Sequence, residues 1–288
     1  MSVVEAWAVI NGSRINLSHG SGNTWSGTGN APLKSSYSQP NHVYAVTIYA
    51  KDDAGNTSQD EATLRVVEKT PPVITPVSPT TGSVITNNKP QIIWEVTDDD
   101  SGVNTGTIGI TIDDQSKVTG SSIQTTQITN GYRCTYTPPN ALGDGSHTIR
   151  FDASDNDGNV AAQKSVTIKI DTTPPTLNLT SPAEGMVTNN PQIVVSGTTN
   201  DATSSPVELT VNGKSVEVQS NGQFSTTITG TEGENTITVI AKDSAGKTTT
   251  VTRHVTVDTG SPEITSVSIT PDPADAGSTV TITAIITD

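Results

Sequence analysis

One seven-residue pattern occurs three times in this chain and constrains its fold more than any other feature. The copies span residues 50–56, 153–159 and 241–247; each reads Ala-x-Asp, then small polar residues and a Gly. An alternating run of apolar and β-branched residues stands on both sides of each copy. Asp and Asn in such a loop bond their own backbone, and Gly adopts the positive φ of a tight turn. The pattern therefore predicts three β-hairpins.

A proline-bearing linker follows each hairpin, at residues 69–72, 171–175 and 258–262. The two landmarks keep the same spacing. The first and second hairpins are 103 residues apart, as are the first and second linkers, and the next intervals are 88 and 87 residues. A period of roughly 90 to 100 residues, built from short strands with turns between them, is typical of tandem β-sandwich domains.

The composition agrees with an all-β protein. Charged residues make up 15% of the 288 residues, Gly and Pro are frequent (24 and 17), and no window has the period of an amphipathic helix. We therefore predict tandem β-sandwich modules arranged as an elongated rod. The only cysteine is Cys134, so no intrachain disulfide can form and apolar burial must stabilise the sandwiches.

The net charge of −14 argues against binding to a nucleic-acid backbone, because such binding needs a basic surface. No run of eighteen apolar residues is present, so membrane insertion is not expected. The N-terminus, Met-Ser-Val-Val-Glu, lacks the basic start and apolar centre of a secretion signal. Either a leader was removed or none is needed, as in virion proteins that are released by lysis.

The landmarks divide the chain into four predicted segments. Residues 1–70 form a partial or compact Ig-like domain, 71–173 and 174–259 form complete sandwiches, and 260–288 form a two-stranded half domain. The Asn11-Gly12 turn matches Asn212-Gly213, which aligns the first segment with only the second half of the third. Its first two strands are therefore missing, and its closing strand is expected at residues 62–67.

Alternation assigns the core of the second segment. Ile108, Ile110 and Ile112 share one face of a strand, as do Tyr132, Cys134 and Tyr136 on another. Trp94 alternates with two apolar neighbours and is predicted to be buried against the opposite sheet. The stretch from residue 81 to 88 is expected to be a loop.

The sequence offers no catalytic constellation. The four histidines fall in different segments or at strand edges without a second ligand at metal spacing, and no nucleophile elbow is present. We therefore predict a non-enzymatic protein without an organic cofactor. The acidic hairpin is the one candidate metal site, because calcium takes six to eight oxygen ligands from flexible loops. Its candidate ligands are Asp152, Asp155, Asp157 and Asn159. Turn capping by the first Asp is the alternative, since the other two hairpins keep only that residue.

Several motifs resemble bacterial immunoglobulin-like repeat domains. These motifs are the Thr-Pro-Pro linkers, the Ala-x-Asp-x-x-Gly-Asn hairpins and the strand entry Asp-Gly-Ser-His at 144–147. Such domains are seven-stranded sandwiches of surface adhesins and virion proteins. The Asn-Asn-Lys-Pro at 87–90 and the segment Thr-Pro-Asp-Pro-Ala-Asp-Ala-Gly at 270–277 look more specifically like Ig-like proteins encoded with the tail genes of phages and prophages of Gram-positive bacteria. That family has no catalytic residues to carry over.

The resemblance implies a structural or host-contact protein of a phage tail or virion, used for adhesion or decoration. Its partners would be other tail proteins, a second copy joined through the terminal strands, or a glycan or protein of the host surface. The alternative is a spacer or adhesion fragment of a bacterial surface adhesin or of a multidomain extracellular enzyme.

Overall fold

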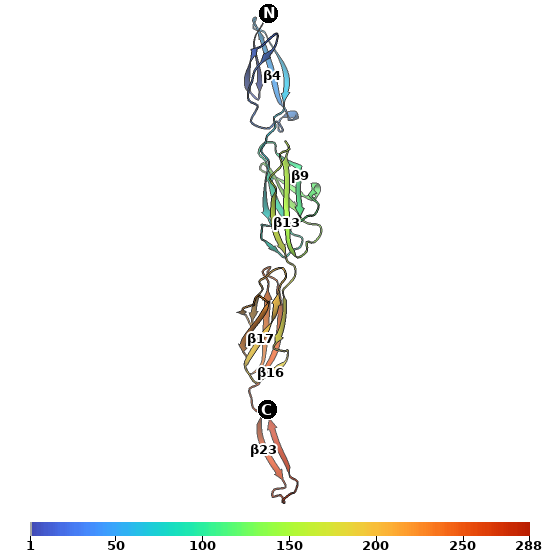
Figure 1. Ribbon diagram of the computed structural model, residues 1–288, viewed down its shortest axis with the longest axis vertical. Coiled ribbons are helices and arrows are strands. Elements are labelled where there is room, and N and C mark those ends of the chain that lie inside the picture. Colours follow the sequence, from blue (N-terminus) through green and yellow to red (C-terminus); the bar gives the residue numbers. More distant parts are fainter. Residues whose placement is uncertain (1) are drawn as a thin grey trace. The chain divides into compact units, whose positions relative to one another are not determined.

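The computed structural model describes residues 2–288, which form two compact units, Met1–Ile170 and Asp171–Asp288. Every part of the chain is built from β-strands, and helical structure is limited to two short 3-10 turns in the described part (Figure 1). The all-β prediction is confirmed. Below, residues 1–70, 71–170, 171–259 and 260–288 are called the first, second and third domains and the C-terminal hairpin.

The first domain is a single sheet of order β3-β2-β1-β4-β5. Its strands are β1 (Val3–Ile10), β2 (Ser13–His19), β3 (Trp25–Ser26), β4 (Tyr44–Asp52) and β5 (Thr57–Leu64). Asn11 (φ 45°) and Gly12 (φ 76°) both lie in the left-handed region, as the predicted two-residue turn between β1 and β2 requires. The prediction of a closing strand at 62–67 was wrong in position. The strand starts five residues earlier because its polar, exposed residues carry no apolar alternation.

The second domain is a sandwich of two sheets, of orders β10-β9-β13-β14-β7 and β11-β12-β8-β6. Its strands are β6 (Val73–Ser78), β7 (Val84–Ile85), β8 (Ile92–Thr97), β9 (Val103–Ile112), β10 (Val118–Thr119), β11 (Gln124–Ile128), β12 (Gly131–Tyr136), β13 (Gly145–Asp155) and β14 (Lys164–Ile170). The stretch predicted as a loop at 81–88 contains β7, which pairs in parallel with the end of β14. Two residues are too few to show alternation.

The core of the second domain lies between its sheets. Trp94 on β8 is fully buried, and its ring centroid is 5.1 Å from that of Phe151, which belongs to the opposite sheet. The prediction for Trp94 is therefore confirmed. The three isoleucines of β9 are buried, as are Cys134 and Tyr136 of β12, whereas Tyr132 is partly exposed at its edge.

The third domain repeats the plan with sheets of orders β15-β17-β20 and β16-β22-β21-β18-β19. Its strands are β15 (Thr176–Ser181), β16 (Met186–Thr188), β17 (Gln192–Asn200), β18 (Glu208–Val211), β19 (Lys214–Val216), β20 (Gln223–Thr229), β21 (Gly233–Lys242) and β22 (Thr248–Val257). The order β19-β18-β21-β22 matches β2-β1-β4-β5 of the first domain. The first domain therefore shares the strand order of one sheet of the third domain.

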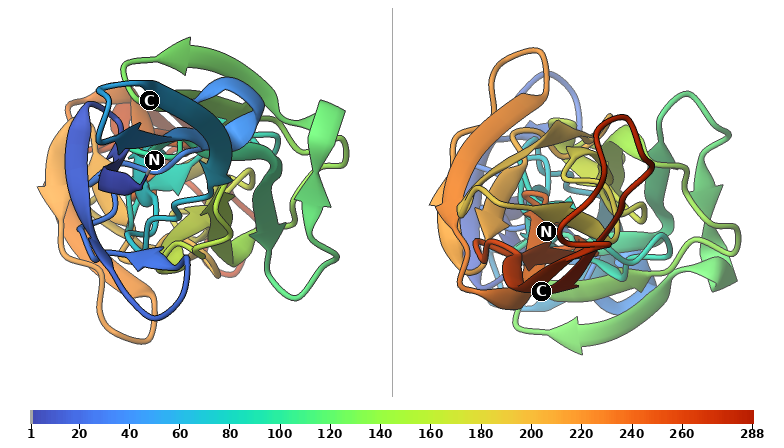
Figure 2. Two further views of the ribbon diagram at one scale, coloured as in Figure 1. Left: turned by 90° about the horizontal axis from the view of Figure 1, so that it is seen from above. Right: turned by 90° about the horizontal axis from the view of Figure 1, so that it is seen from below.

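The C-terminal hairpin pairs β23 (Glu263–Thr270) with β24 (Thr281–Thr287). All its residues are exposed, including the apolar side chains Ile264, Val267, Ile282 and Ile286. Figure 2 shows this hairpin, coloured red, in its view from below. Among residues 2–288, no helix is long and apolar enough to cross a membrane.

Candidate functional site

The first Asp of each hairpin caps its own turn. Asp155 accepts the backbone N–H of Asn159 through Oδ1 (2.8 Å) and the side-chain amide of Asn159 through Oδ2 (2.7 Å). Asp52 makes the same two bonds to Asn56, at 2.8 and 2.9 Å. The Asn56 amide lowers the pKa of the Asp52 carboxyl, because the bond favours the ionised form. In both hairpins the two carboxylate oxygens therefore have partners within the turn.

The other two predicted calcium ligands face different partners. Asp152 lies 3.7 Å from the Lys117 ammonium and accepts a hydrogen bond from the Gln163 amide at 3.1 Å. Asp157 accepts the hydroxyl of Ser35 at 2.6 Å and the backbone N–H of Glu68 at 3.0 Å, both from the first domain. The structure therefore brings Asp155 and Asn159 together and directs Asp152 and Asp157 elsewhere.

Asp157 belongs to a polar contact between the first and second domains. The backbone N–H of Ser35 also donates to Asp100 at 2.8 Å, and the Lys34 ammonium donates to the carbonyl of Asp99 at 3.0 Å. Glu68 accepts the backbone N–H of Ser101 at 2.7 Å. The acidic run 98–100, which follows β8, therefore helps to join these two domains.

Two groups of three acidic residues come together at equivalent places. In each group, one carboxylate oxygen per residue lies within 4.8 Å of the others; the members are Glu68, Asp98 and Asp155 in the first unit, and Asp171, Asp201 and Asp243 in the second. Each contains a linker acid, an acid 30 residues further on that directly follows β8 or β17, and the first Asp of the hairpin. Sequence reasoning missed both groups. The repeated 30-residue interval was the available signal.

The two groups differ in how their charge is compensated. In the first, burial raises the pKa of the Glu68 carboxyl, and the neighbouring charges of Asp98 and Asp100 raise it further, against the hydrogen bonds from Ser101. Its Asp155 is satisfied by Asn159. In the second, Asp171 and Asp243 each keep a buried oxygen, Oδ2, without a hydrogen-bond partner.

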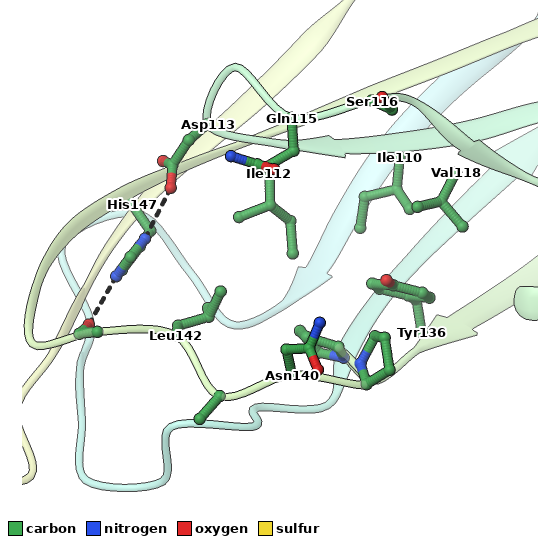
Figure 3. A pocket seen from close by; sticks show the side chains of 14 residues that line it. Ile110, Ile112, Asp113, Gln115, Ser116, Val118, Tyr136, Asn140, Leu142 and His147 are labelled. Atoms are coloured by element: carbon green, nitrogen blue, oxygen red, sulfur yellow. Dashed lines mark hydrogen bonds and ion pairs between the residues drawn. The ribbon is translucent and has the colours of Figure 1, made fainter.

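A hollow of about 400 Å³ opens at one end of the second domain (Figure 3). Its apolar wall includes Ile110, Ile112 and Tyr136, and His147 lies at its rim. The two imidazole nitrogens of His147 are each 2.8 Å from an acceptor, a carboxylate oxygen of Asp113 and the carbonyl of Gly143. Burial lowers the pKa of His147, but these two acceptors outweigh burial and leave it above the usual value.

The cysteine and the other three histidines make packing contacts or hydrogen bonds within their domains. Cys134 is buried, and burial raises the pKa of its thiol to about 12, so the reactive thiolate is disfavoured at neutral pH. His254 pairs with Glu184 at 2.8 Å across two neighbouring segments of the third domain. His19 and His42 lie against the aromatic rings of Trp25 and Tyr37.

Strand order defines the class of protein. The second and third domains each pack one sheet on another, as immunoglobulin-like sandwiches do. Their strands divide between two mainly antiparallel sheets, and β7 and β16 are the parallel exceptions. The chain is thus a tandem Ig-like domain protein.

Comparison with protein families gives one match for each of the two sandwiches. Residues 78–172 match the family described as bacterial Ig-like domain, and residues 175–259 match glucodextranase, domain B. Bacillopeptidase F of Bacillus subtilis (strain 168) is 33% identical over 123 residues, which is 43% of this chain and 8% of that protein. The matched region thus spans less than a tenth of that relative.

Similar solved structures are also tandem-domain proteins. The titin I-band fragment I67-I69 has a TM-score of 0.48 and 12% identity, covering 88% of this chain and 87% of that chain. The tetra-tandem repeat in the extending region of a large adhesion protein has a TM-score of 0.35 and 19% identity, covering 98% and 79%. Fibronectin(III)-like modules of CbhA from Clostridium thermocellum have a TM-score of 0.35 and 19% identity, covering 64% and 94%.

Proposed function

We propose that this chain is a non-enzymatic spacer and contact protein that is displayed outside the cell. The observation that carries the proposal is the succession of two complete Ig-like sandwiches, each with its own family match and its own apolar core. A repeated sandwich adds length and surface without an assembled reaction centre. The bonds that Asp157 and Asp100 make with the first domain fit a spacer, because they hold consecutive domains together.

In its more specific form, the proposal places the chain in the tail or virion of a phage. The support is the resemblance of the segments at 87–90 and 270–277 to Ig-like proteins encoded with tail genes. The exposed acidic surface, with a net charge of −14, would keep such a displayed protein soluble and away from nucleic acid. Its contacts would be other tail proteins and a glycan or protein of the host surface.

A second candidate is a spacer within a larger extracellular enzyme or adhesin. The names of two matches favour it, since one is a domain of a glucodextranase and the other is part of a peptidase. In this setting the catalytic residues would lie in other domains, and the Ig-like domains would set their distance from the cell or substrate.

Immunogold electron microscopy with an antibody against residues 71–259 separates the two candidates. Labelled phage particles, with bare cells, are the expected result for the virion form. If cell surfaces or secreted protein are labelled and the phage particles are bare, the virion form is wrong and the second candidate is supported. Hydrolase activity that co-purifies with this chain and is lost on mutation of its own residues would contradict the non-enzymatic proposal in both forms.

A further inference from the structure

The second acidic group lies at the entrance to the third domain, where three separate elements meet. Asp171 belongs to the linker before β15, Asp201 directly follows β17, and Asp243 begins the turn between β21 and β22. All three residues are nearly inaccessible, with 0%, 6% and 3% of their surface exposed. One carboxylate oxygen from each lies within 4.8 Å of the others.

This group has three formal negative charges. None of the ion pairs formed by the described residues involves Asp171, Asp201 or Asp243. Burying unpaired carboxylates is costly, and like charges at this separation repel one another. A positively charged ligand bound here would compensate this buried charge.

The hydrogen bonds leave a specific set of oxygens free. Asp171 accepts the N–H of Thr173 (3.2 Å) and Asp243 accepts that of Lys247 (2.8 Å), in both cases through Oδ1. The Oδ2 atoms of both residues are buried without a partner, and so is the hydroxyl of Ser204. A buried oxygen without a partner calls for an explanation, and a bound ion is one that would satisfy all three atoms.

The sequence of the third hairpin explains why Asp243 keeps a free carboxylate oxygen, whereas Asp52 and Asp155 do not. Asn56 and Asn159 each donate a side-chain amide to the second oxygen of the hairpin Asp. The equivalent residue in the third hairpin is Lys247, which gives Asp243 only its backbone N–H. The replacement of Asn by Lys therefore leaves Oδ2 of Asp243 available.

We propose that Asp171, Asp201 and Asp243 bind a hard divalent cation, with Ca²⁺ as the best fit. Calcium binds oxygen ligands at about 2.4 Å, so two ligands on opposite sides of the ion are about 4.8 Å apart. One oxygen from each of the three carboxylates lies within that distance of the others, so a single ion can contact all three. Three carboxylates supply up to six oxygens in a flexible, irregular arrangement, which suits calcium better than the strict octahedron of Mg²⁺. The cation would fasten the linker residue Asp171 to two strands of the third domain.

Calcium titration of the full chain tests this site. The EDTA-treated protein is titrated with CaCl₂, and separately with MgCl₂, by isothermal calorimetry, and hydrogen exchange of residues 171–259 is followed by mass spectrometry. The wild type is expected to bind Ca²⁺ in the range of about 10⁻⁴ to 10⁻³ M that is common in extracellular modules, with slower exchange around residues 192–201 and 236–250. No Trp or Tyr lies between residues 171 and 288, so Trp fluorescence reports only the first unit and serves as an internal control.

Variants that replace one Asp by the similarly shaped Asn test whether calcium binds at this group. Asp243→Asn and Asp201→Asn keep the oxygen that accepts the backbone N–H and remove one charge, so each should fold and lose at least about tenfold in calcium affinity. Asp52→Asn, in the first hairpin, is the matched control and should bind as the wild type does. Lys247→Asn restores the amide of the other hairpins and should weaken binding. Equal binding by wild type and Asp243→Asn, or no binding by the wild type, would overturn the proposal in favour of shared protons or Lys247 as the counter-charge.

Discussion

Truncation of Trp94 to Ala should be one of the most damaging single changes in the second domain. The side chain is fully buried, is the largest in the core, and packs against Phe151 of the opposite sheet with ring centroids 5.1 Å apart. Truncating a buried Trp to Ala removes its transfer free energy and leaves a cavity, which together cost about 3 to 5 kcal/mol. That is a large part of the stability of a domain this size.

The indole nitrogen of Trp94 adds a second, sharper expectation. Nε1 is buried without a hydrogen-bond partner, so its N–H group is desolvated without compensation. Trp94→Phe removes this donor and keeps an aromatic ring against Phe151. It should therefore cost much less than Trp94→Ala, even though both variants lose volume.

Urea denaturation followed by far-UV circular dichroism measures both variants, because Trp94 itself would confound fluorescence. Trp25→Ala is the matched control: its ring is partly exposed on the two-residue strand β3, and a loss below about 1 kcal/mol is expected. A loss below about 1 kcal/mol for Trp94→Ala would refute the assigned face of β8. A one-residue slip moves every side chain of a strand to the other face.

Two further predictions concern charge and the C-terminal hairpin. Both neighbours of His147 only accept hydrogen bonds, so its imidazolium is favoured and its folded pKa lies above the usual 6.5. The stability that the His147 imidazolium contributes is fully present below the unfolded pKa and is lost as the pH rises through the folded pKa. Melting temperatures measured from pH 5.5 to 8.5 should therefore fall as the pH rises. The variant His147→Gln should show a smaller fall. An unchanged slope in that variant would contradict the assignment. The exposed apolar strands of residues 263–288 should pair with the edge of another Ig-like sheet, including that of a second copy. Deleting them should lower the mass measured by light scattering or prevent incorporation into particles, and unchanged assembly would exclude a connector role.

Local patterns predicted the all-β fold because sandwiches are built from repeated short strands and turns. Strict alternation identified the buried faces of β9 and β12, and the two Asn-Gly turns fixed their hairpins. Strand β5 was misplaced because an exposed edge strand needs no apolar residues. The short parallel strand β7 was missed because two residues have no period.

The acidic groups could not be assembled from local sequence. Asp171, Asp201 and Asp243 are 30 and 42 residues apart, and only the folding of a linker, a strand end and a hairpin turn brings them together. The calcium site predicted at the hairpin 153–159 rests on ligands that are close in sequence, and it stays a prediction. In the structure, Asn159 donates hydrogen bonds to both carboxylate oxygens of Asp155.

Small-angle X-ray scattering of the full chain tests the spacer function most directly. Proline presets φ and keeps the preceding residue extended, so Thr70, Thr173 and Ser261 should be extended and the domains should stand end to end. We predict a radius of gyration well above the value of about 19 Å that a single compact domain of this length would have. A value near 19 Å, with the scattering profile of a globule, would contradict the proposal that this chain is a spacer of tandem Ig-like domains.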